Sequence, residues 1–187
     1  MTTRSARHAV LSETVTFDKR TGNCASSIET PKGSRNKYDY DPDWDCLELA
    51  TVLPEGMNFP YDFGFVPSTL GEDGDPLDIL VLMDAPVVPG CVIRARPVGA
   101  TEAKQKTKGE DWQRNDRLIA VAAHAQTHQN VQSLEDLRPH LIDEIQEFFI
   151  AYNRLRGRKF KPLALTGSDK IARAIKAGMD AFKKQNH

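Results

Sequence analysis

Prolines are concentrated in the middle of this chain, where seven of the eleven fall between residues 54 and 97. Each proline fixes φ and removes a backbone hydrogen-bond donor, so this density excludes long helices and favours short strands joined by tight turns. The segment from Ser26 to about Val98 is therefore predicted to consist of strands and turns. Within it, β-type runs lie at Leu47–Val52, Ile79–Leu82 and Cys91–Val98.

The pattern changes after Ser133, where apolar residues begin to recur at helical spacing. The recurrence predicts a helix from Leu141 to Leu155, with Gly157 as its C-terminal cap. Ser168 is expected to begin a second amphipathic helix. A strand-rich body followed by two such helices is typical of the α+β class. We therefore expect a small antiparallel β-barrel or sheet flanked by two C-terminal helices.

The length of 187 residues suits one domain, preceded by a polar arm. Residues 1–22 show no sustained hydrophobic period, so they are predicted to form a loose arm with at most a short strand at Thr14–Phe17. Residues 23–187 are predicted to form the domain. Inside it, the charged segment Lys104–Arg114 is interpreted as an exposed loop, and Leu118–Ala123 as a further buried strand.

The balance of charge and hydrophobicity excludes several classes of partner. The 25 basic and 26 acidic residues leave a formal net charge of -1, which gives no basic surface for nucleic acid or for a membrane. No apolar run approaches the ~20 residues that span a bilayer, and the N-terminal residues lack the apolar core of a signal peptide. The three cysteines form no CxxC pair, as expected of reduced thiols. We therefore expect a cytoplasmic protein that binds neither nucleic acid nor membranes.

Four carboxylates lie within seven residues in the run Glu72-Asp73-Gly74-Asp75-Pro76-Leu77-Asp78. Such carboxylates repel one another unless water or cations screen them. Gly74 allows the backbone to turn, and Pro76 stiffens the segment. A set of oxygen ligands favours a hard cation, Mg²⁺ or Mn²⁺ before Zn²⁺. The residues alone leave two interpretations open, a metal site and a solvated acidic turn.

The stretch Asp73–Asp78 resembles the signature of the soluble family I inorganic pyrophosphatases. Further segments similar to that family are Ile28-Glu29-Thr30-Pro31, Lys37-Tyr38-Asp39, Phe59–Gly64, Pro89–Gly99, and Phe148-Phe149 leading to Tyr152. The resemblance extends from about Ser26 to the last helix. It implies an oligonucleotide-binding-like β-barrel flanked by two helices, dependence on Mg²⁺, with Mn²⁺ as an alternative, and assembly into a homo-oligomer. It also implies hydrolysis of pyrophosphate to two phosphates.

The resemblance assigns roles to eight residues. Asp75 is the expected catalytic residue, which accepts a proton from the attacking water. The metal would be held by Asp73, Asp78, Glu29 and Asn115. The substrate would be bound by Lys37, Arg117 and Tyr152.

The chain departs from the family's pattern at several charged positions. Thr51 stands where the family has a phosphate-binding arginine, and Asn153 where it has a lysine. Phe59 and Phe63 stand where it usually has tyrosines. The candidates to replace the missing cations are Arg35, Arg117, Arg154 and Arg156. The basic cluster from Arg154 to Lys161 is otherwise interpreted as a solvated helix end.

A second group of departures precedes the predicted strand at Leu118. Asn115 and Arg117 stand where the family has a metal-binding aspartate and a lysine, and a second aspartate of that loop falls near Glu110 or Asp111. Alternate residues of a strand share a face, so Asn115 and Arg117 are expected to face the metals and Asp116 to face away. On this register, Asn115→Asp is expected to strengthen Mg²⁺ binding.

Two functions follow from these matches and departures. The first is a Mg²⁺-dependent inorganic pyrophosphatase with a modified active site. The alternative is a paralogue of the same fold that binds metal and an anionic phosphate ligand but turns over little. Each charge contact near a protein surface is worth ~1–4 kcal/mol. The loss of the family's charged side chains is therefore expected to lower the rate of hydrolysis more than it affects the fold.

Overall fold

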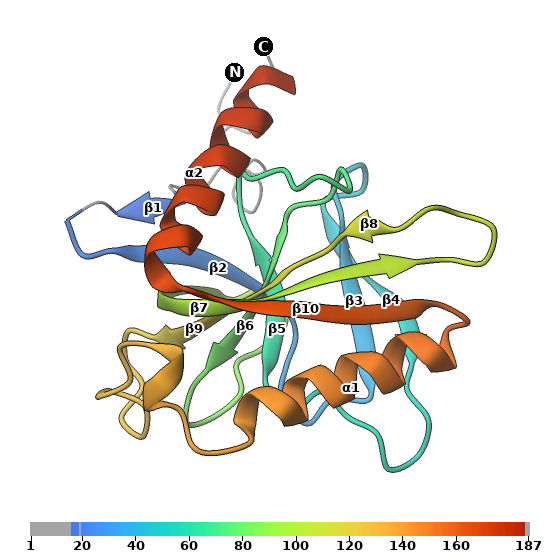
Figure 1. The fold of residues 1–187 in the computed structure, drawn as a ribbon, viewed down its shortest axis with the longest axis horizontal. Helices are drawn as coiled ribbons and strands as arrows, with labels where there is room; N and C mark the ends of the chain where they lie inside the picture. The colour runs from blue at the N-terminus through green and yellow to red at the C-terminus, as the bar shows by residue number, and fades with distance from the viewer. Residues whose placement is uncertain (1–15, 19, 186–187) are drawn as a thin grey trace, which may run out of the picture.

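The computed structural model describes residues 16–18 and 20–185 of the chain (Figure 1). The two helices are α1 (Leu141–Leu155) and α2 (Ser168–Gln185), and a 3₁₀ turn, η1, covers Leu134–Asp136. The strands are β1 (Phe17–Asp18), β2 (Asn23–Thr30), β3 (Asn36–Asp41), β4 (Cys46–Val52), β5 (Asp62–Val66), β6 (Leu77–Leu82), β7 (Val92–Lys106), β8 (Gln113–Arg114), β9 (Arg117–Ala122) and β10 (Lys159–Gly167).

Five strands close into a barrel, because β2, β5, β6, β9 and β7 pair in turn and β7 pairs again with β2. This confirms the predicted α+β fold with a small oligonucleotide-binding-like barrel and two C-terminal helices. The barrel is not entirely antiparallel, however, since β6 and β9 pair in parallel, with Ile79 opposite Leu118. β9 lies between β6 and β7, which run in opposite directions, so it must be parallel to one of them.

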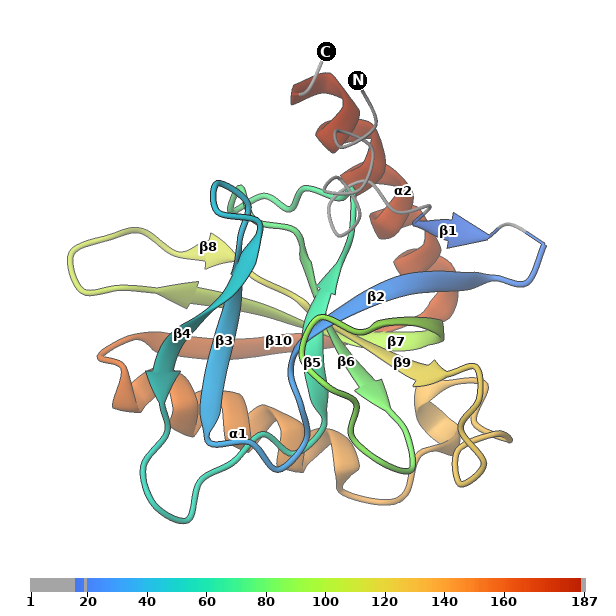
Figure 2. The same ribbon diagram turned by 180° about the vertical axis from the view of Figure 1, so that it is seen from behind.

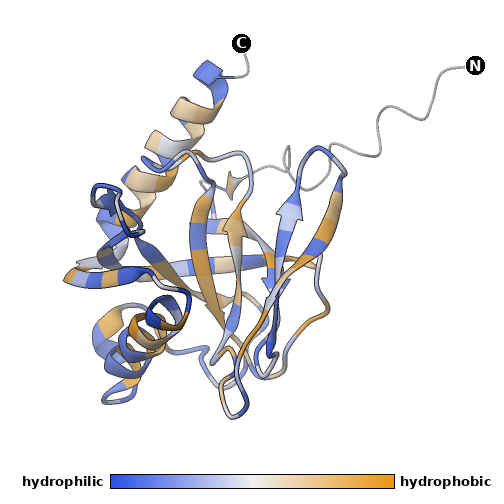
Figure 3. Ribbon diagram, turned by 90° about the vertical axis from the view of Figure 1, so that its right-hand side faces the viewer, coloured by the Kyte–Doolittle hydropathy of each residue, from blue (hydrophilic) through white to orange (hydrophobic). Residues whose placement is uncertain are grey.

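The hydrophobic core joins the barrel to both helices. The apolar runs of β6 and β9 are almost completely buried, as are Ile145 and Phe149 of α1 and Ile171 and Ile175 of α2. The strands are accordingly hydrophobic where they cross the centre of the molecule, whereas the hairpin tips are hydrophilic (Figure 3). Burial of this continuous apolar surface is what fixes the helices against the barrel.

The two helices begin and end close to the predicted residues. α1 has the predicted bounds, and Gly157 follows it with φ +71°, the left-handed conformation expected of a C-terminal cap. α2 begins at Ser168, as predicted. The strand between the helices, β10, was not predicted. It pairs antiparallel with the second half of β7, from Lys159 opposite Lys106 to Gly167 opposite Gly99.

The segment Lys104–Arg114 is a β-hairpin rather than the predicted loop. β7 continues to Lys106, and β8 pairs with it through Lys104 opposite Arg114. The ammonium groups of Lys104 and Lys106 lie 4.9 and 5.6 Å from the centre of the Trp112 ring. These cation–π contacts and the backbone pairing order charged residues that look like a loop by composition.

The β3–β4 hairpin stands beside the barrel as a separate two-stranded sheet (Figure 2). Of the predicted N-terminal arm, residues 1–15 and 19 lie outside the described residues. Phe17 and Asp18 form β1 and pair with the start of β2, and Thr16 is buried and donates a hydrogen bond to the carbonyl of Pro67 at 2.8 Å. Among the described residues, none of the helices has the length and apolar character to cross a membrane.

Candidate active site

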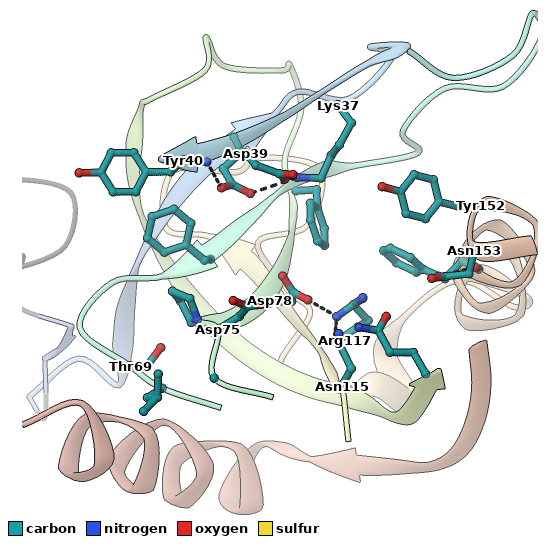
Figure 4. Close-up of a pocket in the computed structure, with 18 of the residues that line it drawn as sticks. Lys37, Asp39, Tyr40, Thr69, Asp75, Asp78, Asn115, Arg117, Tyr152 and Asn153 are labelled. Atoms are coloured by element: carbon teal, nitrogen blue, oxygen red, sulfur yellow. Dashed lines mark hydrogen bonds and ion pairs between the residues drawn. The ribbon is translucent and has the colours of Figure 1, made fainter. Parts of the chain in front are cut away.

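A cleft of about 590 Å³ lies on one side of the barrel, between the β3–β4 hairpin, the loop before β6, and α1 (Figure 4). Its walls come from segments that are far apart in the sequence. Seven of the eight residues assigned from the sequence line it: Glu29, Lys37, Asp75, Asp78, Asn115, Arg117 and Tyr152. The fold therefore brings nearly the whole predicted set into one cavity.

Asp73 is the assigned residue that does not line the cleft. Its carboxylate lies against its own turn, where Oδ1 accepts a hydrogen bond from the backbone N–H of Asp75 at 3.3 Å. Burial raises the pKa of Asp73, and the charges of Asp78 and Asp75 raise it further against the effect of that hydrogen bond. Gly74 has φ +91°, so the turn that separates Asp73 from Asp75 requires glycine.

On one wall of the cleft, a buried lysine is surrounded by oxygen atoms. Nζ of Lys37 donates hydrogen bonds to Glu29 Oε2 at 3.3 Å, to the carbonyl of Tyr38 at 2.6 Å, and to Asp39 Oδ1. These partners use all three donors of the ammonium group. Burial lowers the pKa of Lys37, but the charges of Glu29 and Asp39 outweigh that effect and the pKa is raised.

Glu29 is held in the same wall by a second contact. Its Oε1 accepts a hydrogen bond from the backbone N–H of Tyr40 at 2.7 Å. Burial raises the pKa of Glu29 to about 7, although Lys37 and the Tyr40 N–H both oppose this shift. The Glu29 carboxyl therefore changes its charge near neutral pH.

Across the cleft, one guanidinium group bridges two oxygen-bearing side chains. Nη1 of Arg117 donates to Oδ2 of Asp78 and to Oδ1 of Asn115 (Figure 4). Arg117 begins β9 and Asp78 lies on the adjacent strand β6, which brings the two together from 39 positions apart in sequence. Burial raises the pKa of Asp78, and the charges of Arg117 and Lys37 oppose that rise.

The register predicted for residues 115–117 is confirmed. Asn115 and Arg117 face the cleft, whereas Asp116 faces the other side of the sheet. There Asp116 Oδ1 accepts hydrogen bonds from the backbone N–H of Ala103 at 2.9 Å and from Nε of Arg114 at 2.5 Å. Asp116 is therefore a structural residue that fixes the hairpin to β7.

Glu110 and Asp111, near which the family's second aspartate of this loop falls, do not line the cleft. Both residues are exposed at the tip of the β7–β8 hairpin, and the side chain that lines the cleft from this hairpin is Gln105. The hairpin pairing explains these positions. Gln105 lies on the paired part of β7, opposite Gln113, with its side chain toward the cleft, whereas residues 110 and 111 lie in the turn beyond the paired residues.

The cleft contains two further arginines beside the C-terminus of α1. Arg156 donates a hydrogen bond to the hydroxyl of Tyr152, and both Arg156 and Arg158 line the cleft. Arg156 was one of the candidates to replace a missing cation, whereas the contribution of Arg158 was not predicted. The interpretation of this basic cluster as a solvated helix end is corrected, since Lys159 and Lys161 lie on β10.

The candidate cation Arg35 and the substituted residues Thr51 and Asn153 each have a neighbouring partner in the fold. Arg35 donates to the carbonyl of Leu53 and to Glu55, outside the cleft, and Thr51 lies on β4 opposite Lys37. Asn153 lines the cleft, but its Nδ2 donates to the carbonyl of Phe149 at 2.9 Å. Of the arginine candidates, Arg117 and Arg156 are therefore the ones that reach the cavity.

The two phenylalanines that replace tyrosines belong to an aromatic wall. Phe59 and Phe63 are buried, and their rings lie 5.6 Å apart. Phe59 also packs edge-on against Tyr152 at 5.8 Å, and Phe63 packs against Phe149 at 5.7 Å. A hydroxyl at either position would need a hydrogen-bond partner in an apolar cluster, so phenylalanine suits this wall.

The oxygen donors that could hold a hard cation are on Asp75 and Asp78, with Glu29 and Asp39 on the facing wall. Among residues 16–18 and 20–185, no three Asp, Glu, His or Cys side chains are grouped closely enough to hold a metal together. The charged lining is evenly divided between four acidic and four basic side chains. They are Glu29, Asp39, Asp75 and Asp78 against Lys37, Arg117, Arg156 and Arg158.

Residues 26–183 match the inorganic pyrophosphatase family. An inorganic pyrophosphatase of Synechocystis sp. is 40% identical over 156 residues, which cover 83% of this chain and 89% of that protein. The inorganic pyrophosphatase of Thermus thermophilus is 42% identical over 140 residues, covering 75% and 77% of the two chains. A crystal structure of inorganic pyrophosphatase from Thermus thermophilus superposes with a TM-score of 0.84 at 36% identity, covering 92% of this chain and 98% of that one. The chain belongs to the inorganic pyrophosphatase family.

Proposed function

We propose that this protein hydrolyses inorganic pyrophosphate to two phosphates in the cleft, with Mg²⁺ as the cofactor and Mn²⁺ as an alternative. The observation that carries the proposal is the convergence, in one cavity, of the signature carboxylates Asp75 and Asp78 with the cations Lys37 and Arg156. Carboxylates suit a hard metal ion, and cations suit phosphate oxygens, so the two sets together fit a metal–pyrophosphate complex.

The charge of the cleft explains why a metal ion is needed. Equal numbers of acidic and basic side chains line it, so the protein alone offers no excess positive charge to a polyanion. Bound Mg²⁺ supplies that charge and lowers the pKa of its water. Asp75 and Asp78 offer hard oxygen ligands for it, with Glu29 on the facing wall. Asp73 would join them only if its side chain turned away from the N–H of Asp75.

The substrate contacts in this proposal come from two elements that wall the cleft, β3 for Lys37 and the C-terminal end of α1 for Tyr152 and Arg156. Tyr152 and Arg156, already hydrogen-bonded to each other, present a hydroxyl and a guanidinium to one phosphate group. Lys37 presents its ammonium group to the other. Its partner Asp39 is more than half exposed, so Asp39 is the partner that a phosphate oxygen can replace most easily.

The hydrolytic step in the proposal requires a proton acceptor. The oxygen of water forms a new bond to phosphorus, and the bridging P–O bond breaks with its electron pair on the departing phosphate. Asp75 accepts the proton of the attacking water. Its carboxylate is exposed in the cleft, and none of the ion pairs of the described residues engages it, which suits this role.

The experiment that tests the proposal is phosphate release from pyrophosphate in excess Mg²⁺, compared with the same reaction in excess EDTA. We expect turnover with Mg²⁺ and loss of turnover on chelation. Tight binding of Mg²⁺-pyrophosphate without phosphate release would instead support the low-activity paralogue. Equal turnover in EDTA would contradict the metal-dependent reaction.

The proposal also covers the cellular setting. We propose a cytoplasmic protein whose small-molecule partners are pyrophosphate and phosphate, and which forms a homo-oligomer. Exposed apolar side chains on β10, Leu163 and Leu165, support self-association. Light scattering coupled to size-exclusion chromatography measures the mass of the assembly, and a mass of one chain would contradict this part.

A further inference from the structure

We infer that the guanidinium group of Arg117 takes the place of one divalent cation in this cleft, so that the chain supplies one of its own site cations. Nη1 of Arg117 donates to Oδ2 of Asp78 and Oδ1 of Asn115 at the same time. These are two of the residues expected to hold metal. The position between their oxygen atoms is therefore already filled by a positive charge.

The surroundings of Arg117 favour a guanidinium over a hydrated metal ion. Arg117 is only 5% exposed, and its guanidinium carbon lies 4.9 Å from the centre of the Phe149 ring, 5.7 Å from Phe160 and 5.8 Å from Phe63. A guanidinium is weakly hydrated and is attracted to aromatic faces. Mg²⁺ usually keeps several waters, which three aromatic rings cannot accommodate well.

The charge of the two ligands leads to the same conclusion. Asp78 contributes one negative charge and Asn115 none, so a single guanidinium neutralises the pair. Asp73, another carboxylate of the same run, does not add its charge here, because it lies against the N–H of Asp75. A dication at this position would keep an uncompensated charge among aromatic side chains, and hard cations are held largely by carboxylate charge.

This inference reverses the effect expected of Asn115→Asp. With Arg117 in place, the new carboxylate pairs with the guanidinium, so no Mg²⁺ site is added and Mg²⁺ affinity changes by less than about twofold. The double variant Asn115→Asp with Arg117→Gln has two carboxylates and no resident cation. It should bind one more Mg²⁺ or Mn²⁺ ion per chain than the original protein.

The test counts bound ions without substrate, by Mn²⁺ titration followed by electron paramagnetic resonance and by Mg²⁺ titration calorimetry. It compares the original protein, Asn115→Asp, the double variant, and the control Arg114→Gln. Arg114 is an arginine three residues before Arg117 that also contacts carboxylates, but it is partly exposed and pairs with Glu102 and Asp116 outside the cleft. We expect one additional ion in the double variant alone, and a melting temperature of that variant that rises more with Mg²⁺.

Two results would overturn the inference. One is an Asn115→Asp variant that gains an ion or binds Mg²⁺ tenfold more tightly while Arg117 is present. The other is a folded double variant with the same ion count as the original protein. Should the double variant not fold, the single variant decides, because it keeps Arg117. The inference rests on the proposed function only for the choice of metal, and ion counts without substrate fail or succeed independently of pyrophosphate turnover.

Discussion

Nζ of Lys37 lies 3.3 Å from Oε2 of Glu29, and both side chains are buried in the wall of the cleft. A buried pair of this kind stays charged only if each partner compensates the desolvation of the other. Burial raises the pKa of Glu29 to about 7 despite Lys37, whereas Lys37 keeps a raised pKa and remains cationic. The Glu29 carboxylate is therefore protonated, and the pair loses its negative charge, as the pH falls through about 7.

The first prediction concerns stability against pH. The folded state binds the Glu29 proton more tightly than the unfolded state, whose pKa is near 4.5. The free energy of unfolding should therefore fall as pH rises from about 4.5 to about 7, by up to roughly 3 kcal/mol from this group. Urea unfolding in EDTA measures the slope, and Glu29→Gln should remove this part of it. Parallel pH profiles for the two proteins would show that Glu29 does not titrate in this range.

The second prediction concerns the arginine beside Tyr152. Arg156→Gln should raise KM for Mg²⁺-pyrophosphate by roughly tenfold, because it removes a charge-assisted contact to phosphate, while kcat falls less. The matched control is Arg154→Gln, an exposed arginine in the last turn of α1 that does not line the cleft. Steady-state kinetics of both variants check the prediction. An equal effect in the two would mean that the general charge of this surface, rather than Arg156 itself, binds substrate.

The sequence was most informative where apolar periodicity was strong or residue type alone carried the chemistry. The spacing of apolar residues in the sequence was enough to predict the helix Leu141–Leu155 and the strand that ends at Leu82. β10 did not, because most of its side chains are exposed and its partner strand is more than 50 positions away. Its pairing with β7 depends on the backbone of the folded protein rather than on a local pattern.

Within the site, the sequence predicted which types of side chain are present, but it did not predict the contacts that they make. The cleft-facing position of Asn115 followed from strand alternation, whereas that of Gln105 depended on where the β7–β8 hairpin turns. The turn of Asp73 away from the cleft, and the contact of Arg117 with two oxygen donors, arise from packing among loops and rings. Such contacts are set in three dimensions, so spacing in the sequence carries no signal for them.

The third prediction concerns the close approach of β5 to β2. A Cβ on Gly64 would lie 1.8 Å from the backbone oxygen of Ser27, so Gly64→Ala must displace a backbone segment two residues before Glu29. We expect a loss of about 3 kcal/mol or more in stability. Gly167→Ala, which meets nothing within 4 Å, is the matched control and should stay within about 1 kcal/mol. Chemical denaturation of both variants gives the comparison, and equal stabilities would contradict the β2–β5 packing described above.

The measurement that tests the central claim most directly is phosphate release from Mg²⁺-pyrophosphate by the original protein, Asp75→Asn and the control Glu72→Gln. Asn is nearly the same size as Asp but accepts no proton, so we predict a rate roughly 10²–10⁴-fold lower for Asp75→Asn with an unchanged melting temperature. Glu72 is an exposed carboxylate of the same run that does not line the cleft, so Glu72→Gln should retain the original rate. A folded Asp75→Asn variant that releases phosphate as fast as the original protein would contradict the account.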